Sequence, residues 1–221
     1  GIPNEFISNL DDNIKNNFDK TINIFKELKT IIKYISLPNI KLSIPAYYII
    51  APAECSSNLS KYDGIRFGYK YENSLNIKDL YSKSRSEGFG EEVIRRIMIG
   101  TYVLSSSYYN EYYIKAQKIR AIIRNDYINA FKKVNVILGP TTPTNAFKIN
   151  SKKISPTEMY KSDIYTCSVN LAGLPAISIP TGLINNLPVG LQIIGNFFKE
   201  NEILNLAHQY QLNTIWHKIS P

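Results

Sequence analysis

The sequence predicts an α/β domain, because helical and strand-like patterns alternate along its 221 residues. Apolar residues recur at helical spacing in several segments, and short runs rich in β-branched residues follow them. Hydrophobic residues make up 44% of the chain and charged residues 20%, which is the usual balance of a protein that buries a core. We therefore expect residues 1–221 to form the C-terminal part of a single domain, with an incomplete N-terminal edge and no internal domain boundary.

The N-terminal part predicts a strand, a helix, a second strand and a second helix. Ile2-Pro3 has the character of a strand end, and apolar residues from Ile14 to Leu28 recur at helical spacing after a cap at Asn9 or Asp11. The later elements are a strand at Lys29–Leu37, closed by Pro38, and a helix in Ser43–Asn58 that begins at Pro45 and is dented at Pro52.

The middle of the chain is predominantly helical. Asp63-Gly64 marks a turn in Lys61–Tyr69, and a short helix is expected at Leu75–Lys83. Glu91–Lys133 is the longest helical region, and Ser105–Ser107 should interrupt it, since serines compete for backbone hydrogen bonds inside helices.

The C-terminal part combines strands with Gly- and Pro-rich turns. The expected elements are a strand at Val134–Leu138 followed by the loop GPTTPT, a helix around Met159–Cys167, strands AISIP and VGLQIIG joined by TGLINNLP, and a helix at Glu202–Leu212. The segment NLAGLP, Asn170–Pro175, comes directly before a buried strand, as turns that present backbone at a binding site often do.

The net charge of +8 raises the question of nucleic-acid binding. The lysines are scattered along predicted helices, however, which favours ordinary solvated helix faces. No apolar run reaches the ~18 residues that a membrane helix needs, so no membrane partner is expected. Cys55 and Cys167 match no disulfide or zinc framework, which indicates a reducing compartment.

The residues alone reveal no catalytic centre. The motifs HExxH, GxxxxGK, GxGxxG and GxSxG are all missing from the sequence. The two cysteines have only His208 and His217 as histidine partners, in no recognisable signature, so inert cysteines are the better interpretation. We expect no catalytic residue, metal or cofactor in this chain.

Five strings, taken together and in order, carry a family resemblance. They are PAYYIIAPAECSSNLSKYDGIRFG, RSEGFGEEVIRRIMIGTYVLSSSYYNEYYIKAQKIR, NVILGPTTPT, MYKSDIY and NLAGLPAISIPTG with LPVGLQIIG. In these strings the chain resembles the C-terminal half of the A subunits of glutamyl-tRNA(Gln) amidotransferases, which form a branch of the amidase signature family.

This resemblance implies a fold and a reaction. The fold is a mixed central β-sheet covered by helices. The complete subunit hydrolyses glutamine with a serine nucleophile, a cis-serine and a lysine, all in a family segment that this chain does not contain. The ammonia then serves an ATP-dependent ligase reaction, in which Glu-tRNA(Gln) becomes Gln-tRNA(Gln) during protein biosynthesis. The implied partners are the B and C subunits, free glutamine and Glu-tRNA(Gln), with ATP and Mg on the partner subunit.

By position in the matching strings, Tyr47, Arg96 and Asp163 correspond to residues that line the family's glutamine pocket. Arginine offers a bidentate fork for the α-carboxylate, and an aspartate can hold the α-ammonium. From spacing alone, Arg96 would simply pair with Glu92 on a helix face, and Arg95 is the alternative ligand.

Two other functions remain open: a different amidase-signature hydrolase, or a non-catalytic scaffold or tRNA-adjacent adaptor. Clustered tyrosines at 108, 109, 112 and 113 could stack on bases, although packing of a helical core against the sheet is the preferred interpretation. The expected location is the bacterial cytoplasm, with a mitochondrion or plastid as the alternative.

Overall fold

The computed structural model describes residues 1–8, 10–147 and 162–219. The chain forms two compact units. The first, which we call the sheet unit, comprises Gly1–Ile44 and Arg120–Pro221, and the second, the helical unit, comprises Pro45–Ile119.

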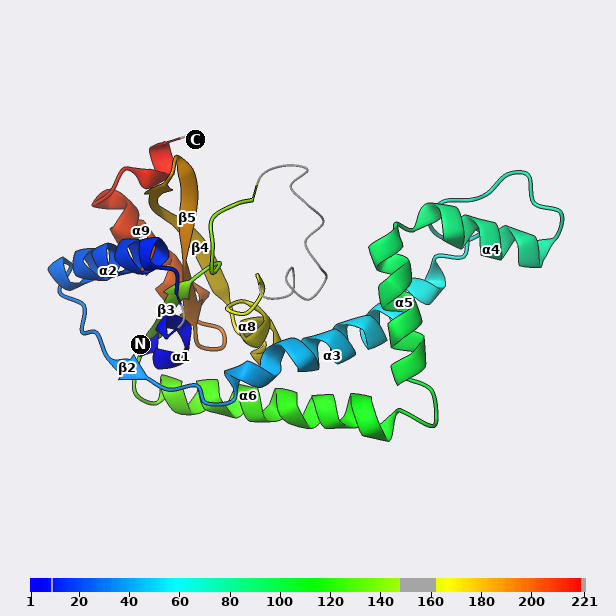
Figure 1. Cartoon of the computed structure of the whole chain (residues 1–221), viewed down its shortest axis with the longest axis horizontal. Coiled ribbons are helices and arrows are strands. Elements are labelled where there is room, and N and C mark those ends of the chain that lie inside the picture. The colour runs from blue at the N-terminus through cyan, green and yellow to red at the C-terminus, as the bar shows by residue number, and fades with distance from the viewer. Residues whose placement is uncertain (9, 148–161, 220–221) are drawn as a thin grey trace. The chain divides into compact units, whose positions relative to one another are not determined.

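The sheet unit contains one antiparallel and one parallel sheet, so both kinds of strand pairing occur in it, as the resemblance implied (Figure 1). Strands β3, β5 and β4 are neighbours in an antiparallel sheet, while β1 pairs with β2 in parallel. The Gly1 nitrogen donates to the Val136 carbonyl and the Leu138 nitrogen donates to the Gly1 carbonyl, which is the bonding of a parallel pair and joins β1 to β3. The strands are β1 (Ile2–Pro3), β2 (Tyr34–Ile35), β3 (Val136–Pro140), β4 (Ala176–Ile184) and β5 (Leu187–Gly195).

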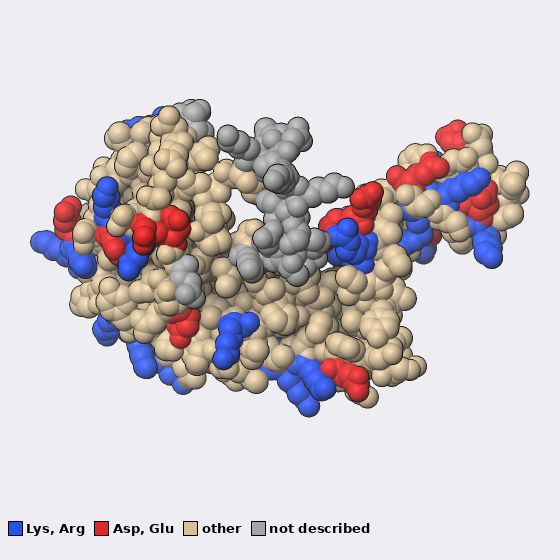
Figure 2. Space-filling model, viewed as in Figure 1, with Lys and Arg blue, Asp and Glu red and all other residues tan. Residues whose placement is uncertain are grey.

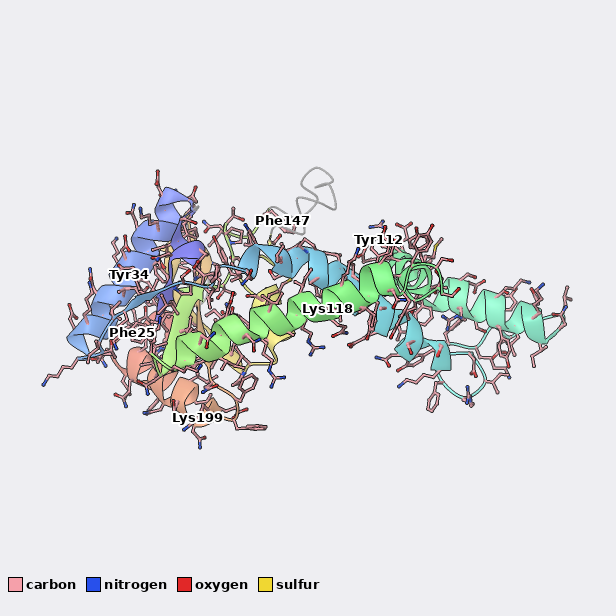
Figure 3. All side chains as sticks on the ribbon, turned by 90° about the horizontal axis from the view of Figure 1, so that it is seen from below. Phe25, Tyr34, Tyr112, Lys118, Phe147 and Lys199 are labelled. Carbon is pink, nitrogen blue, oxygen red and sulfur yellow. The ribbon has the colours of Figure 1, made fainter. Side chains whose placement is uncertain are left out.

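Helices α2 (Asp12–Glu27) and α9 (Glu200–Leu212) cover one face of this sheet. Asp11 caps α2 through its side chain, which accepts from the Asn13 nitrogen, so Asp11 is the cap of the two that were predicted. Phe25, labelled on α2 in Figure 3, is fully buried in the core between these helices and the strands. The core comprises Ile2, Phe18, Ile22, Phe25, Leu138, Ile179, Leu191, Ile193, Ile203, Ala207 and Tyr210.

The hairpin of β4 and β5 is tighter than predicted. TGLINNLP is not a loop: both strands run through it, and only Asn185 and Asn186 form the turn. Both asparagines have positive φ, 52° and 61°, as a two-residue turn between twisted strands requires. A bulge between Pro180 and Gly182 shifts the register and breaks the alternation on which the prediction relied.

The predicted strand at Lys29–Leu37 is also wrong, since only Tyr34–Ile35 pairs with a neighbour. The first residues of the predicted strand, Lys29 and Thr30, instead form the C-terminal cap of α2. Lys29 has a positive φ of 61°, and both the nitrogen and the hydroxyl of Thr30 donate to the Phe25 carbonyl. The apolar run therefore begins inside a helix C-cap, where the backbone cannot be extended.

The helical unit contains most of α3 (Ser43–Asn58), α4 (Ile77–Gly88) and α5 (Glu91–Val103). The predicted break around Ser105–Ser107 is confirmed, because α5 ends at Val103 and a π-helical turn at Asn110–Ile114 leads into α6 (Lys115–Phe131). α3 runs through Pro52, and α5 lies so close to it that a Cβ on Gly100 would be 1.9 Å from the Pro52 carbonyl oxygen.

The tyrosine cluster does not form the buried core that we expected. Tyr109 and Tyr112 are each 38% exposed, and the rings pack on one another, with Tyr109 and Tyr113 stacked at 5.3 Å between centroids. The polar hydroxyls of adjacent tyrosines favour such a half-solvated arrangement.

The helix expected around Met159–Cys167 falls partly outside the described residues. Residues 162–166 form turns, and the described helix, α8, begins where the prediction ended, at Cys167, and runs to Ala172. On the face shown in Figure 2, Lys and Arg are interspersed with Asp and Glu, in keeping with the expected solvated helix surfaces.

Candidate functional site

Two of the three predicted binding residues meet in the helical unit. Tyr47 lies on α3 and Arg96 on α5, and the Arg96 Nη1 donates to the Tyr47 hydroxyl at 2.8 Å. Helical periodicity could not have predicted this contact, because it joins two helices that are far apart in sequence.

Arg96 is also bound to Glu92, which was the simpler alternative for this residue. The Arg96 Nε donates to one carboxylate oxygen of Glu92 at 3.0 Å, and Arg95 donates to the other at 2.7 Å. The side chain of Arg96 is 28% exposed and that of Arg95 is 49% exposed. The two arginines therefore differ: Arg95 has a surface ion pair, whereas Arg96 also makes a partly buried contact with a second helix.

The environment of Arg96 stabilises its positive charge. The hydrogen bond with Tyr47 raises the pKa of Arg96 further above its usual range, and Glu92 acts in the same direction, while partial desolvation opposes both. The guanidinium carbon also lies 5.7 Å and 5.9 Å from the ring centroids of Tyr47 and Tyr48. Arginine has more N–H donors than these bonds use, so the group can bind a further anion such as a carboxylate.

In the sheet unit, the two turns singled out in the sequence line one hollow of about 340 Å³. Thr141, from the GPTTPT loop, and Asn170, from α8, both contribute to its lining. The Thr141 hydroxyl lies 2.8 Å from that of Ser178 on β4, and the buried Gln192 of β5 completes a neutral, polar floor. Such a lining, with both donors and acceptors, is suited to a small polar ligand.

The glycine of NLAGLP ends α8. Gly173 has a φ of 74°, and its nitrogen donates to the Asn170 carbonyl while the Leu174 nitrogen donates to the Val169 carbonyl. This is a Schellman motif, which needs a residue with left-handed φ and therefore favours glycine. The motif turns the chain from α8 into β4 and so places the Asn170 and Leu174 sides of the hollow.

Asp163, the third predicted residue, belongs to the sheet unit. It lies half-buried in the turns at 162–166, three residues before Thr166, which lines the hollow. Its backbone carbonyl accepts from the Thr166 and Cys167 nitrogens at 3.1 Å and 2.9 Å. The structure thus brings Tyr47 and Arg96 together and places Asp163 near the hollow in the sheet unit.

Sequence reasoning missed Ser178 and Gln192 as individual residues. The available signal was polarity inside two apolar strands, AISIP and VGLQIIG, in which each is the one polar side chain. Only the pairing register places them on the same face of the sheet, since Ser178 and Gln192 are direct partners across β4 and β5.

Comparison with known proteins identifies the family. The amidase family model matches residues 1–204. The chain belongs to the amidase family. This membership agrees with the mixed α/β fold.

Relatives within this family point to one branch. The chain is 55% identical over 222 residues to the A subunit of the glutamyl-tRNA(Gln) amidotransferase of Ruthia magnifica, covering 100% of this chain and 46% of the relative. The corresponding protein of Pseudomonas fluorescens is 53% identical, again over 100% of this chain and 46% of its own length. The chain therefore spans about half the length of the curated relatives that it matches.

Comparison with solved structures identifies the same family fold. The crystal structure of the A subunit of the glutamyl-tRNA(Gln) amidotransferase from Thermotoga maritima superposes with a TM-score of 0.69 at 36% identity, covering 96% of this chain and 42% of that one. The crystal structure of an amidase has a TM-score of 0.74 over 96% of this chain and 45% of its own, and at 19% identity it supports the fold alone.

Within residues 1–8, 10–147 and 162–219, no group of three or more His, Cys, Asp or Glu side chains is arranged to hold a metal ion. Among the helices of the same residues, none combines the length and the apolar character required to cross a bilayer. The expectation of ATP and Mg on a partner protein stays a prediction.

Proposed function

We propose that this chain forms the glutamine-binding part of the glutamine-hydrolysing A subunit of a glutamyl-tRNA(Gln) amidotransferase. In this proposal Arg96 binds the α-carboxylate of glutamine, the Tyr47 hydroxyl orients Arg96 and borders the site, and Asp163 binds the α-ammonium. An enzyme specific for a free amino acid must pair both charges, because a charge that is buried without a partner is costly.

The reaction would proceed on groups outside this chain. A serine hydroxyl attacks the side-chain carbonyl carbon of glutamine, a lysine and a bridging serine carry the proton to the leaving nitrogen, and ammonia departs. Water then hydrolyses the glutamyl ester and releases glutamate. The ammonia amidates the γ-carboxyl of Glu-tRNA(Gln), which ATP activates on the partner B subunit in a complex with the C subunit. The net result is a carbon–nitrogen ligase reaction in the bacterial cytoplasm, or in an organelle as the alternative.

One observation carries this proposal beyond family membership. The Arg96 guanidinium is held by Tyr47 and Glu92 in a partly buried position and keeps donors to spare. This is the arrangement expected of a preorganised carboxylate site, and the identity of 55% to an amidotransferase of this specificity supports the choice of glutamine as the ligand.

The test uses the complete A subunit, purified together with its B and C partners. The proposal predicts glutamate release from glutamine, and formation of Gln-tRNA(Gln) only when ATP is present. Turnover of simple amides by the isolated A subunit, with no preference for glutamine, would instead identify a different amidase. A complex that binds tRNA with a steep salt dependence but releases no glutamate would favour the adaptor function.

A further inference from the structure

Gln192 is an unusual residue at the centre of an apolar strand. It lies on β5 between Leu191 and Ile193, both of which pack in the core, and its own side chain is 5% exposed. Across the sheet it faces Gly139 on one side and Ser178 on the other. A buried amide costs free energy unless it is hydrogen-bonded, so its bonds show what it does.

The side-chain amide of Gln192 is bound to the segment that carries Asp163. Its Nε2 donates to the Tyr165 carbonyl at 3.0 Å, and this bond is buried. The ring of Tyr165 is 4% exposed and packs edge-on against Phe6 at 5.4 Å. The bond from Gln192 therefore fixes the backbone of the turn at 162–166 to the middle of the sheet.

The turn and α8 form one continuous hydrogen-bonded piece, because the Asp163 carbonyl accepts from the first residues of the helix. The far side of this piece is attached to α6 at two other points. The Tyr127 hydroxyl lies 2.7 Å from that of buried Ser168, and the Arg120 Nε donates to the Leu171 carbonyl at 2.9 Å. These two bonds hold α8, and the Gln192 bond reaches the turn that bears Asp163.

We propose that Gln192 is a positioning residue for Asp163, and that it thereby sets the selectivity of the site for a ligand with an α-ammonium group. This inference rests on the proposed function. A well-packed apolar side chain at position 192 would stabilise the buried strand at least as well as glutamine does. A role in positioning the turn at 162–166 therefore explains why this position has an amide. A displacement of about 1 Å is enough to weaken a charged contact severely.

The experiment compares two ligands in the complete amidotransferase. Glutamine has the α-ammonium group, while glutaramate has the same carboxylate and amide without it and is used as a competitive inhibitor. For Gln192→Met, which keeps the length but removes the donor, we expect the KM for glutamine to rise roughly tenfold with kcat within about twofold, and the Ki of glutaramate to stay within about twofold.

The matched control is Tyr127→Phe, which removes the other buried side-chain bond to this piece of the chain but does not touch the turn. It should lower the thermal stability and leave the ratio of KM to Ki unchanged. Gln192→Asn is the second variant and takes the place of Gln192→Met if the latter does not fold. It keeps the amide but is too short to reach the Tyr165 carbonyl, so it should raise the KM for glutamine and leave the Ki of glutaramate unchanged. In an Asp163→Asn background, neither Gln192 variant should change the KM further.

Three results would overturn the inference. Equal increases in KM and Ki would show a general structural role. An unchanged KM in both Gln192 variants, while Asp163→Asn raises it, would overturn this inference and leave the proposed function intact. A wild-type complex that releases no glutamate from glutamine would overturn the proposed function and this inference with it.

Discussion

Replacing Arg96 by alanine separates the two roles that its contacts suggest, substrate binding and surface pairing. Arg96 donates to Tyr47 and to Glu92, and 28% of its side chain is exposed. Because solvent screens much of this pairing, Arg96→Ala should cost about 1 kcal/mol of folding free energy or less. If Arg96 binds only its two neighbours, Arg96→Ala should lower the folding free energy by this amount and leave kcat/KM for glutamine unchanged.

If Arg96 binds the carboxylate of glutamine, Arg96→Ala should also lower kcat/KM, and this loss should exceed the loss of folding free energy. Truncating one partner of a hydrogen-bonded charge pair at a desolvated site costs about 2–5 kcal/mol. Tyr47 and Glu92 already hold the guanidinium, so little side-chain freedom remains to be lost on binding. We therefore expect kcat/KM for glutamine to fall on the order of a hundredfold, which corresponds to about 2.8 kcal/mol.

The assay is steady-state glutamate release by the complete complex, with Arg95→Ala as the matched control. Arg95 lies on the same helix, binds the same carboxylate and is 49% exposed, so its replacement should change kcat/KM less than about twofold. Arg96→Lys keeps the charge but loses the planar fork and should fall between the two. The reasoning is refuted if Arg96→Ala and Arg95→Ala have equal effects, or if the effect of Arg95→Ala is the larger.

Two further predictions concern stability and are checked by thermal unfolding of the complete A subunit. Gly100→Ala should destabilise it by about 2 kcal/mol, since the new Cβ would lie 1.9 Å from the Pro52 carbonyl oxygen and the clash outweighs the better helix propensity of alanine; a higher Tm would contradict the close approach of α3 and α5. Phe198→Gly should stabilise it by about 0.5–1 kcal/mol, because Phe198 has a φ of 58° and is 93% exposed, so that glycine relieves strain and loses almost no packing; a lower Tm would show that the ring is held in the complete protein.

Much of the fold could be predicted from local patterns. The helix after Asp11 followed from apolar spacing, and the break at Ser105–Ser107 followed from the chemistry of serine in helices. The errors arose where one residue changed the backbone. Lys29, with its positive φ, turned an apparent strand into a helix cap, and the bulge before Gly182 concealed the second half of β4.

The candidate site was predictable only in part. The binding roles of Tyr47, Arg96 and Asp163 were predicted from the family resemblance. Their contacts depend on tertiary packing, which the periodicity of the sequence does not reveal. The bond between Tyr47 and Arg96 joins two helices, and the bond from Gln192 to Tyr165 joins a strand to a turn. Gln192 was hidden because a single polar residue in a strand has no distinctive spacing.

The central claim is that this chain binds free glutamine by its two charged groups. The most direct measurement is a crystal structure of the complete A subunit, in its complex, with glutamine bound. We predict the α-carboxylate within hydrogen-bond distance of Arg96 and the α-ammonium within hydrogen-bond distance of Asp163, with Gln192 still bound to the Tyr165 carbonyl. Glutamine bound without contact to either Arg96 or Asp163 would contradict this claim.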